Sequence, residues 1–368
     1  MKTSVLSVCF LFSVIVSHAQ NDTRKINFPN VEGYQTVIVD LHMHTVFSDG
    51  SVWPDIRVYE AVKDGIDLIS LTDHLEYQPH SADIPHPNRN RAYELASRIA
   101  EQEGLIVVNG SEITRSMPPG HSNAVFIQDA NKLLIDDPIE AYREANRQGA
   151  FVFWNHPNWT SHKKDGIAKL TDMHRQLISE KLLHGIEVVN DVTFSDEAFK
   201  IALDNNLTIL GTSDIHGLVD WQYKIPLGNH RPVTLVFVTE KSEEGVKRAL
   251  MEGRTSVWFK NLLLGREEHI VPLINASIVV KSASYSDNHT VLPVVITNNT
   301  GVKFILENLS DYTFHADSYI VEIKANGETI LQVKTINKLE QFSLHFRVLN
   351  ALTAPKTHPE VTLNILTE

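Results

Sequence analysis

The chain has 368 residues, of which 42% are hydrophobic and 21% are charged, and its formal net charge at pH 7 is −12. This composition excludes a disordered chain, a collagen-like repeat and a small disulfide-stapled scaffold. The acidic balance and the lack of long Lys or Arg runs argue against binding to nucleic acid or anionic membranes, so we expect a small-molecule partner. At about 150 residues per domain, the length predicts two domains, or one barrel with a smaller module.

The first residues have the pattern of a secretory signal peptide. An apolar stretch over 5–16 follows Lys2 and precedes Ser17-His18-Ala19, where small residues suit signal peptidase. This stretch is too short to span a membrane, and no other segment reaches that length. We therefore expect a signal peptide over 1–19, a linker over 20–35 and an exported protein, periplasmic or secreted. The only cysteine, Cys9, would leave with the signal peptide, so the mature chain would hold no disulfide.

Apolar segments alternate with amphipathic ones after the linker. Strands are predicted over 37–44, 68–74, 105–114, 124–128, 151–156, 185–190, 208–214 and 233–238. Helices are predicted over 88–103, 138–148, 195–205 and 242–252. This alternation predicts a parallel sheet, and the number of units favours closure into a barrel over 36–265.

The pattern changes near Gly265. Short runs rich in Val, Ile, Phe and Thr follow, which predict a small antiparallel β-sandwich over 266–368. Asn326-Gly327 lies between alternating segments within 321–333, and this dipeptide predicts a β-hairpin.

Histidines and carboxylates cluster at the ends of the predicted strands. His42 and His44 lie two residues apart, so both imidazoles point to one face of their strand. In parallel barrels, functional residues gather at the carboxyl ends of the strands. The residues that would share this mouth are His42, His44, Asp49, His74, Glu112, His121, His156, Asp214 and His216. Since one catalytic zinc takes about three protein ligands, this set predicts three metal ions.

Four segments carry a family resemblance: D-L-H-M-H-T-x-x-S-D-G from Asp40, L-T-D-H from Leu71, N-H-P from Asn155 and S-D-I-H from Ser213. In order and spacing they resemble the motifs of the PHP (polymerase and histidinol phosphatase) family, over about 37–259. The resemblance implies a distorted (β/α)7 barrel, a trinuclear metal site and hydrolysis of phosphoesters.

The resemblance also implies how the ligands are divided. The first ion would be held by His42, His44, Glu112 and Asp214, the second by Glu112, His121 and His156, and the third by Asp49, His74 and His216. Glu112 would thus bridge two ions, and these would lower the pKa of a shared water until it is a hydroxide able to attack phosphorus. Imidazole and carboxylate ligands suit zinc, manganese and iron equally well.

Four further residues are candidates for roles beside the ligands. Arg115 follows Glu112 closely and is a candidate phosphate-binding cation, or else a surface arginine in a rim salt bridge. His230 is a candidate substrate contact, although its position before the strand over 233–238 places it toward the opposite rim. Asp40 and Asp73 lie beside ligands, where they would orient an imidazole or serve only the structure.

The sequence therefore predicts an exported metal-dependent phosphoesterase, and specifically a phosphodiesterase that acts on small esters. The signal peptide, the stretch over 112–121 and the trailing β-module resemble exported PHP phosphodiesterases. A phosphomonoesterase, an amide or lactone hydrolase, and a non-catalytic protein that binds metal or glycan are the alternatives. The oligomeric state stays open.

Overall fold

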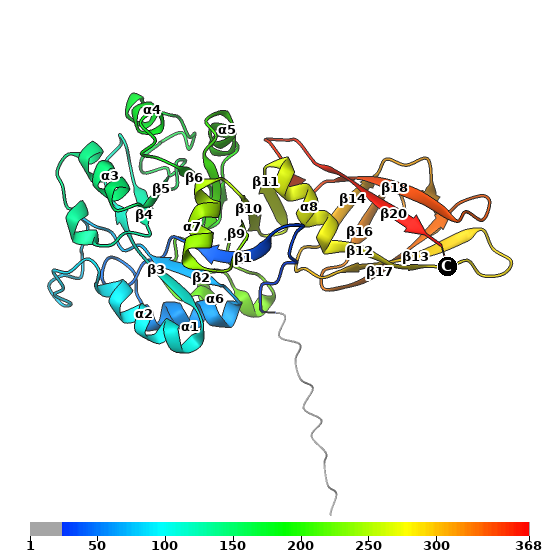
Figure 1. Ribbon diagram of the computed structural model, residues 1–368, viewed down its shortest axis with the longest axis horizontal. Helices are drawn as coiled ribbons and strands as arrows, with labels where there is room; N and C mark the ends of the chain where they lie inside the picture. Colours follow the sequence, from blue (N-terminus) through cyan, green and yellow to red (C-terminus); the bar gives the residue numbers. More distant parts are fainter. Residues whose placement is uncertain (1–23, 368) are drawn as a thin grey trace, which may run out of the picture.

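The computed structural model describes residues 24–367, so the predicted signal peptide lies outside the described residues. The described chain forms two regions that lie end to end along the long axis (Figure 1). We call residues 24–265 the barrel region and residues 278–367 the sandwich region. Within residues 24–367, no helix combines the length and the apolar character needed to cross a membrane.

A curled sheet of twelve strands forms the centre of the barrel region, and one of them, β19, is contributed by residues 351–352 of the sandwich region. Its strands are β1 (Gln35–Asp40), β2 (Leu68–Leu71), β3 (Ile106–Ile113), β4 (Ser122–Val125), β5 (Phe151–Trp154), β6 (Gly185–Asn190), β7 (Thr193–Phe194), β8 (Thr208–Thr212), β9 (Val233–Val238), β10 (Thr255–Phe259), β11 (Leu262–Gly265) and β19 (Ala351–Leu352). Their order is β19-β11-β10-β9-β1-β2-β3-β4-β5-β6-β7, and β8 pairs with β6. Every residue of β2, β5, β6, β8 and β9 is buried, which explains their continuous apolar runs.

The sheet is mixed, whereas the alternation of strands and helices predicted a parallel one. β1, β2 and β3 are parallel, as are β5, β6 and β8. β4 runs antiparallel to both β3 and β5, because a loop containing Pro118-Pro119-Gly120 returns the chain without a crossover helix. β9, β10 and β11 also form antiparallel pairs.

Threonine side chains link β8 to the far side of the curl. The Thr234 hydroxyl on β9 accepts from the backbone N–H of Gly211 and donates to its carbonyl, at 2.9 Å each. The Thr255 hydroxyl on β10 donates to the carbonyl of Ile209 at 2.8 Å. These side chains satisfy buried backbone groups where the strands share no ladder, and they bring the strand that precedes Asp214 close to β9.

Helices surround the curled sheet (Figure 1). They are α1 (Pro54–Asp64), α2 (Arg91–Glu103), α3 (Pro138–Arg147), α4 (Asp172–Ser179), α5 (Asp196–Asp204), α6 (Val219–Gln222) and α7 (Glu243–Met251), with short 3₁₀ turns η1 (Ala130–Leu133) and η2 (Ile225–Leu227). Three helices predicted from sequence begin at a polar cap: the side chains of Asp137, Ser195 and Ser242 accept a backbone N–H of the first turn. α8 (Glu267–Ser277) connects the two regions.

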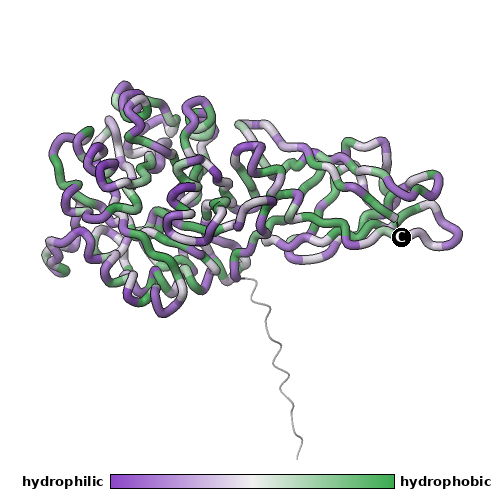
Figure 2. Tube along the Cα trace, in the orientation of Figure 1, coloured by the Kyte–Doolittle hydropathy of each residue, from purple (hydrophilic) through white to green (hydrophobic). Residues whose placement is uncertain are grey.

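The sandwich region consists of two four-stranded antiparallel sheets. Its strands are β12 (Ile278–Ala283), β13 (Val291–Asn298), β14 (Phe304–Asn308), β15 (Thr313–Phe314), β16 (Ile320–Ile323), β17 (Gly327–Lys334), β18 (Gln341–Val348) and β20 (Glu360–Leu366). Their orders are β12-β13-β17-β15 and β16-β14-β18-β20. Buried and exposed residues alternate along β20, as a strand with one face on a core requires. Hydrophobic segments run through the middle of both regions (Figure 2).

The predicted hairpin at Asn326-Gly327 is wrong. β16 and β17 flank this dipeptide but belong to different sheets, so the turn carries the chain across the sandwich. The Asn298 side-chain amide holds the crossing segment by donating to the carbonyls of Val302 and Lys324, at 2.7 and 3.0 Å. Asn326 has a φ of 47°, which Asn tolerates in a crossing turn as readily as in a hairpin.

Candidate metal centre

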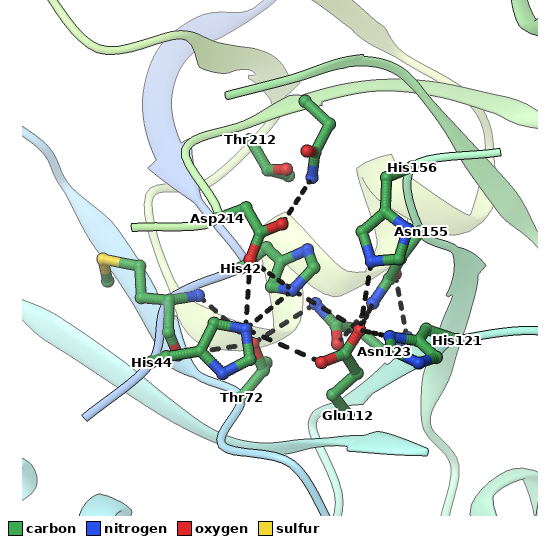
Figure 3. A network of polar contacts seen from close by, with 12 residues as sticks. His42, His44, Thr72, Glu112, His121, Asn123, Asn155, His156, Thr212 and Asp214 are labelled. Carbon is green, nitrogen blue, oxygen red and sulfur yellow. Dashed lines mark hydrogen bonds and ion pairs between the residues drawn. The ribbon is translucent and has the colours of Figure 1, made fainter. Parts of the chain in front are cut away.

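Polar side chains from several strand ends meet at one end of the curled sheet. Figure 3 shows His42, His44, Glu112, His121, His156 and Asp214 turned toward one another. His42 and His44 follow β1, Glu112 ends β3, His121 precedes β4, His156 follows β5, and Asp214 follows β8. The strand-end positions chosen from sequence therefore share one mouth.

Backbone pairing beyond the regular strands fixes these positions. The segment after β1 pairs with the segment after β8: Asp214 N–H donates to the His42 carbonyl at 2.9 Å, and His44 N–H donates to the Ile215 carbonyl at 3.0 Å. Asp214 and His156 have φ values of 48° and 28°, a backbone conformation that costs about 1–3 kcal/mol at a non-glycine residue. Such strain at strand ends is typical of functional sites.

One group of donor atoms consists of His42, His44 and Asp214. The Nε2 atoms of the two histidines lie 3.1 Å apart, and each lies 3.1 Å from Asp214 Oδ1. Ligands at about 2.0–2.2 Å from one zinc ion lie roughly 3.0–3.5 Å from one another. The spacing therefore fits three ligands of a single ion.

Glu112 lies between several imidazoles and is fully buried. Its Oε1 lies 3.0 Å from His121 Nδ1, 3.5 Å from His156 Nε2 and 3.7 Å from His42 Nε2. Its Oε2 lies 2.6 Å from His74 Nδ1 and 3.6 Å from His44 Nε2. One carboxylate thus reaches histidines from both sides, which is the placement that a bridging ligand needs.

A further group consists of His44, Asp49, His74 and His216. Asp49 Oδ1 lies 3.1 Å from His216 Nε2, and Asp49 Oδ2 lies 3.4 Å from His74 Nε2. The loop that carries Asp49 folds tightly over His44: a Cβ on Gly50 would lie 2.6 Å from the His44 carbonyl carbon, so only glycine fits there.

The structure divides the nine residues differently from the expected division at three of them. His44 belongs to the group around Asp49 as well as to the group around Asp214. His74 forms a group with Glu112 and His121 in addition to the one with Asp49. His156 contacts Glu112 but belongs to none of the three groups. The groups therefore overlap through imidazoles that lie between them.

The donor set fits divalent cations. Among the described residues, no hydrogen bond of regular geometry reaches the buried atoms Glu112 Oε2, Asp214 Oδ1 and His156 Nδ1. The nearest polar atoms to the two carboxylate oxygens are imidazole nitrogens, and buried carboxylates cost several kcal/mol unless a cation compensates them. Imidazole and carboxylate donors are also the ligands that zinc, iron and manganese accept.

Comparisons with known proteins agree with this site. A two-domain protein from Bacteroides vulgatus, described as containing a predicted PHP-like metal-dependent phosphoesterase, is 38% identical with a TM-score of 0.86, and the match covers 93% of this chain and 98% of that chain. The chain belongs to the PHP-like metal-dependent phosphoesterases. An Ig-like family model, DUF5001, matches residues 278–364 of this phosphoesterase. The predicted family, the fold class of an α/β barrel followed by an antiparallel sandwich, and the hydrolase activity are thereby confirmed.

Two other solved structures match less of the phosphoesterase. PsfC from Pseudomonas syringae is 16% identical with a TM-score of 0.41, over 61% of this chain and 92% of that chain. An amidohydrolase from Chromobacterium violaceum, with bound sulfate and no metal, is 17% identical with a TM-score of 0.36, over 49% of this chain and 87% of that chain. The search of curated proteins found no match.

Opposite charges set the protonation of the centre. Burial alone would raise the pKa of Glu112, but the neighbouring His74, His121 and His42 hold this pKa well below its usual range. Burial alone would lower the pKa of His42, yet the carboxylates around it raise this pKa well above its usual range. Burial, together with nearby histidines, lowers the pKa of His44 to about 4. Metal ions would therefore compete with protons at part of this phosphoesterase site.

Glu187 is the main residue of the site that sequence reasoning missed. Its Oε1 lies 2.7 Å from His42 Nδ1 and accepts from the Thr212 hydroxyl at 2.6 Å. Its Oε2 accepts from the backbone N–H of His156 at 2.6 Å. The contact between Glu187 Oε1 and His42 Nδ1 orients the His42 ring so that its Nε2 faces the other ligands. The available signal was a lone glutamate inside the apolar run of β6.

Two asparagines also support the centre. The Asn155 side-chain amide donates to Glu112 Oε1 at 2.8 Å and to Asn123 Oδ1 at 2.9 Å. The Asn123 amide in turn donates to the Leu41 carbonyl at 3.2 Å. These bonds tie the bridging position to the strands on either side (Figure 3).

Asp73 is linked to an imidazole through one other side chain, whereas Asp40 is not. Asp73 accepts from the backbone N–H and hydroxyl of Thr45, both at 2.7 Å, and from the Ser48 hydroxyl at 2.6 Å. The Ser48 oxygen lies 3.2 Å from His44 Nδ1, so Asp73 reaches an imidazole through Ser48. Asp40 contacts no imidazole; it accepts from Ser213 N–H at 3.1 Å and pairs with Arg231.

The structure does not bring Arg115 or His230 into contact with the histidine cluster. The Arg115 guanidinium pairs with Glu76 at 2.8 Å and donates to the Ile135 carbonyl, as the salt-bridge alternative requires. The His230 ring stacks on Trp258 with centroids 3.3 Å apart, and its nitrogens contact the carbonyls of Arg231 and Lys260.

Proposed function

We propose that this phosphoesterase is a phosphodiesterase that hydrolyses small phosphate esters at a centre of three divalent ions. The position of Glu112 carries the proposal, since its two oxygens approach histidines that belong to different groups of donor atoms. A carboxylate in this position suits a bridge between two ions that act on one phosphoryl group.

In this proposal each set of residues has a separate task. His42, His44 and Asp214 would hold one ion, His121 and His156 a second, and Asp49, His74 and His216 a third, with Glu112 between the first two. Divalent ions in such a site lower the pKa of a water molecule to near neutrality and neutralise charge on phosphoryl oxygens. Zinc, manganese and iron all suit these ligands.

The chain itself supplies orientation and a low dielectric. Glu187 fixes the ring of His42, and Asp73 fixes His44 through Ser48. His42, His44 and Glu112 are fully buried, so bulk water does not weaken their interaction with developing charge. Glu112 stays ionised because the surrounding histidines hold its pKa low.

Elemental analysis together with turnover assays tests the proposal. We expect about three ions per chain and faster hydrolysis of bis-p-nitrophenyl phosphate than of p-nitrophenyl phosphate. Glu112→Ala should lose roughly two ions and at least about a thousandfold in kcat/KM. Glu328→Ala changes an exposed carboxylate of the sandwich region and serves as the control.

Other outcomes would redirect the proposal. Preference for the monoester would make the protein a phosphomonoesterase, and turnover of an acyl ester or amide alone would indicate carbonyl hydrolysis. If Glu112→Ala kept the metal content and activity of the wild type, the bridging role would be wrong.

We further propose that the protein is exported, on the pattern of its first 19 residues. N-terminal sequencing of the protein purified from its native cells tests this proposal. A mature chain that starts at Gln20 and lies outside the cytoplasm is expected. A cytoplasmic chain that retains Met1 would contradict export.

A further inference from the structure

A cavity of about 1230 Å³ lies where the barrel region meets the sandwich region. Its walls include Lys224 and Lys260 of the barrel region and Gly301 and Asn326 of the sandwich region. None of the nine candidate metal ligands lines it. Ligand pockets commonly measure about 300–1,000 Å³ and occur between domains, so this cavity has room for a ligand of oligosaccharide size.

Cations dominate the charge of this cavity, although the whole chain is acidic. Arg24, Lys25, Lys224 and Lys260 line it, against one carboxylate, Asp191. Arg24 is neutralised by Asp64 and Asp220, at 2.6 Å each. Within residues 24–367, the three lysines form no ion pair with a carboxylate. Lysines that line a cavity without carboxylate partners favour an anionic ligand.

Two of these lysines have an unusual backbone conformation, which the test below takes into account. Lys224 and Lys260 have φ values of 51° and 54°, in the left-handed region that glycine adopts without strain. A lysine at such a position stores backbone strain. Both side chains are exposed, and the Lys260 ammonium stays at the cavity wall, 4.7 Å from the centroid of the Phe259 ring and 3.5 Å from the Val192 carbonyl. Lys181 and Lys356 adopt the same conformation outside the cavity, so this strain does not by itself mark a ligand site.

Side-chain amides supply neutral hydrogen-bonding groups beside the cations. Asn229 and Asn326 line the cavity, both are exposed, and their side chains make no hydrogen bond to another described residue. An amide both donates and accepts, as hydroxyl groups of a sugar require. The indole N–H of Trp258, another wall residue that is 6% exposed, also has no partner among the described residues.

We propose that this cavity between the two regions binds an acidic oligosaccharide, through Lys25, Lys224 and Lys260 on its anionic groups and amides on its hydroxyls. A carboxylate or a sulfate would supply the negative charge equally well. The site is separate from the metal centre, and the proposal does not depend on which ester is hydrolysed there.

Isothermal titration calorimetry with the full protein tests the proposal. Trigalacturonate carries carboxylates, a sulfated disaccharide carries sulfate, and maltotriose is the neutral probe. These probes contain no phosphoester bond, so hydrolysis of a phosphate ester cannot contribute heat. We expect at least one acidic probe to bind, maltotriose to bind at least about tenfold more weakly, and the affinity to fall between about 20 and about 200 mM NaCl.

Four glycine variants separate the ligand from the backbone. Lys224→Gly and Lys260→Gly relieve the left-handed backbone but remove a cation, so each should weaken binding about tenfold without lowering Tm. Lys181→Gly and Lys356→Gly relieve the same conformation, at φ values of 55° and 59°, outside the cavity and should leave affinity unchanged. The proposal is overturned if neither acidic probe binds, if maltotriose binds as tightly, or if the cavity variants bind like the controls.

Discussion

The barrel region and the sandwich region bury different kinds of side chain. The barrel region buries Asp40, His42, Glu112, Glu187 and Arg231 almost completely. In the described part of the sandwich region, the buried polar residues are Asn298, Thr300, Thr335 and Asn350, and none of them is ionisable. Because a buried charge costs free energy unless it is compensated, an apolar core is the simpler way to fold. Of these residues, His42, Glu112 and Glu187 belong to the metal centre, whereas Asp40 and Arg231 form an ion pair with each other.

The largest effect on stability should follow from breaking the buried charge cluster at Arg231. Its guanidinium lies 2.7 Å from Asp64 and 3.3 Å from Asp40, and Arg231→Met would leave both carboxylates buried without it. We expect a loss of about 3–5 kcal/mol in the free energy of unfolding, measured by urea denaturation with circular dichroism. Arg347→Met removes a half-exposed arginine that pairs with Glu307 and Glu360 in the sandwich region, and it should cost at most about 1 kcal/mol. Equal losses in the two variants would remove the contrast between the regions.

A smaller effect, on metal binding, should follow from Glu187→Gln. The amide keeps the size of the side chain but weakens its bond to His42 Nδ1, which orients that imidazole. We expect metal affinity to fall about 10–100-fold, as measured by titration of the metal-free protein. Glu322→Gln, at an exposed carboxylate of β16, is the matched control. Unchanged affinity in Glu187→Gln would show that this buried charge serves only the fold.

A pH-dependent effect should come from His174, which is buried against Trp154. Burial lowers the pKa of His174 to about 4, whereas the unfolded chain titrates near 6.5. Between these values the unfolded state binds the proton and the folded state does not, so stability falls as the pH falls from about 6.5 to 4. The loss should approach roughly 2–3 kcal/mol at pH 4, and His174→Gln should flatten that part of the stability profile. His289→Gln, at an exposed histidine of the sandwich region, should leave the profile unchanged.

The smallest effect should follow from Ser48→Ala. This change removes the link between Asp73 and His44 Nδ1 but leaves both charged groups in place. One lost hydrogen bond of about 0.5–1.5 kcal/mol predicts a roughly two- to tenfold lower kcat/KM at limiting metal concentration. Ser284→Ala, at an exposed serine, is the control. If Ser48→Ala lowered kcat/KM by about 100-fold, the position of the loop around Asp49 would depend on Ser48.

Strand ends were the part of the site that the sequence could predict. His42 and His44 share a face because a strand alternates with a period of two, and strand carboxyl ends converge in a barrel. The division into groups could not be predicted, because His44 and His74 lie between groups and each imidazole offers two nitrogens. Glu187 was missed because its partner His42 lies 145 residues away in the chain.

The fold shows the same limit. Apolar runs and caps such as Ser195 and Ser242 located most strands and helices, because these signals are local. The direction of β9 depends on a distant partner, so the alternation of strands and helices predicted it wrongly. The sheet that β17 joins also depends on distant partners, so the Asn326-Gly327 turn predicted that wrongly too. Nothing in the turn sequence records the bond from Asn298 that holds the crossing.

The pairing of β19 with β11 matters while the chain is being synthesised. Ala351 and Leu352 pair with Leu263 and Leu264, so the outermost barrel strand receives its neighbour only after the intervening sandwich strands have been synthesised. Until then β11 presents unpaired N–H and C=O groups, which can recruit a second nascent chain. A chain cut between β11 and β19 keeps this open edge permanently and would aggregate through it, even with every metal ligand in place.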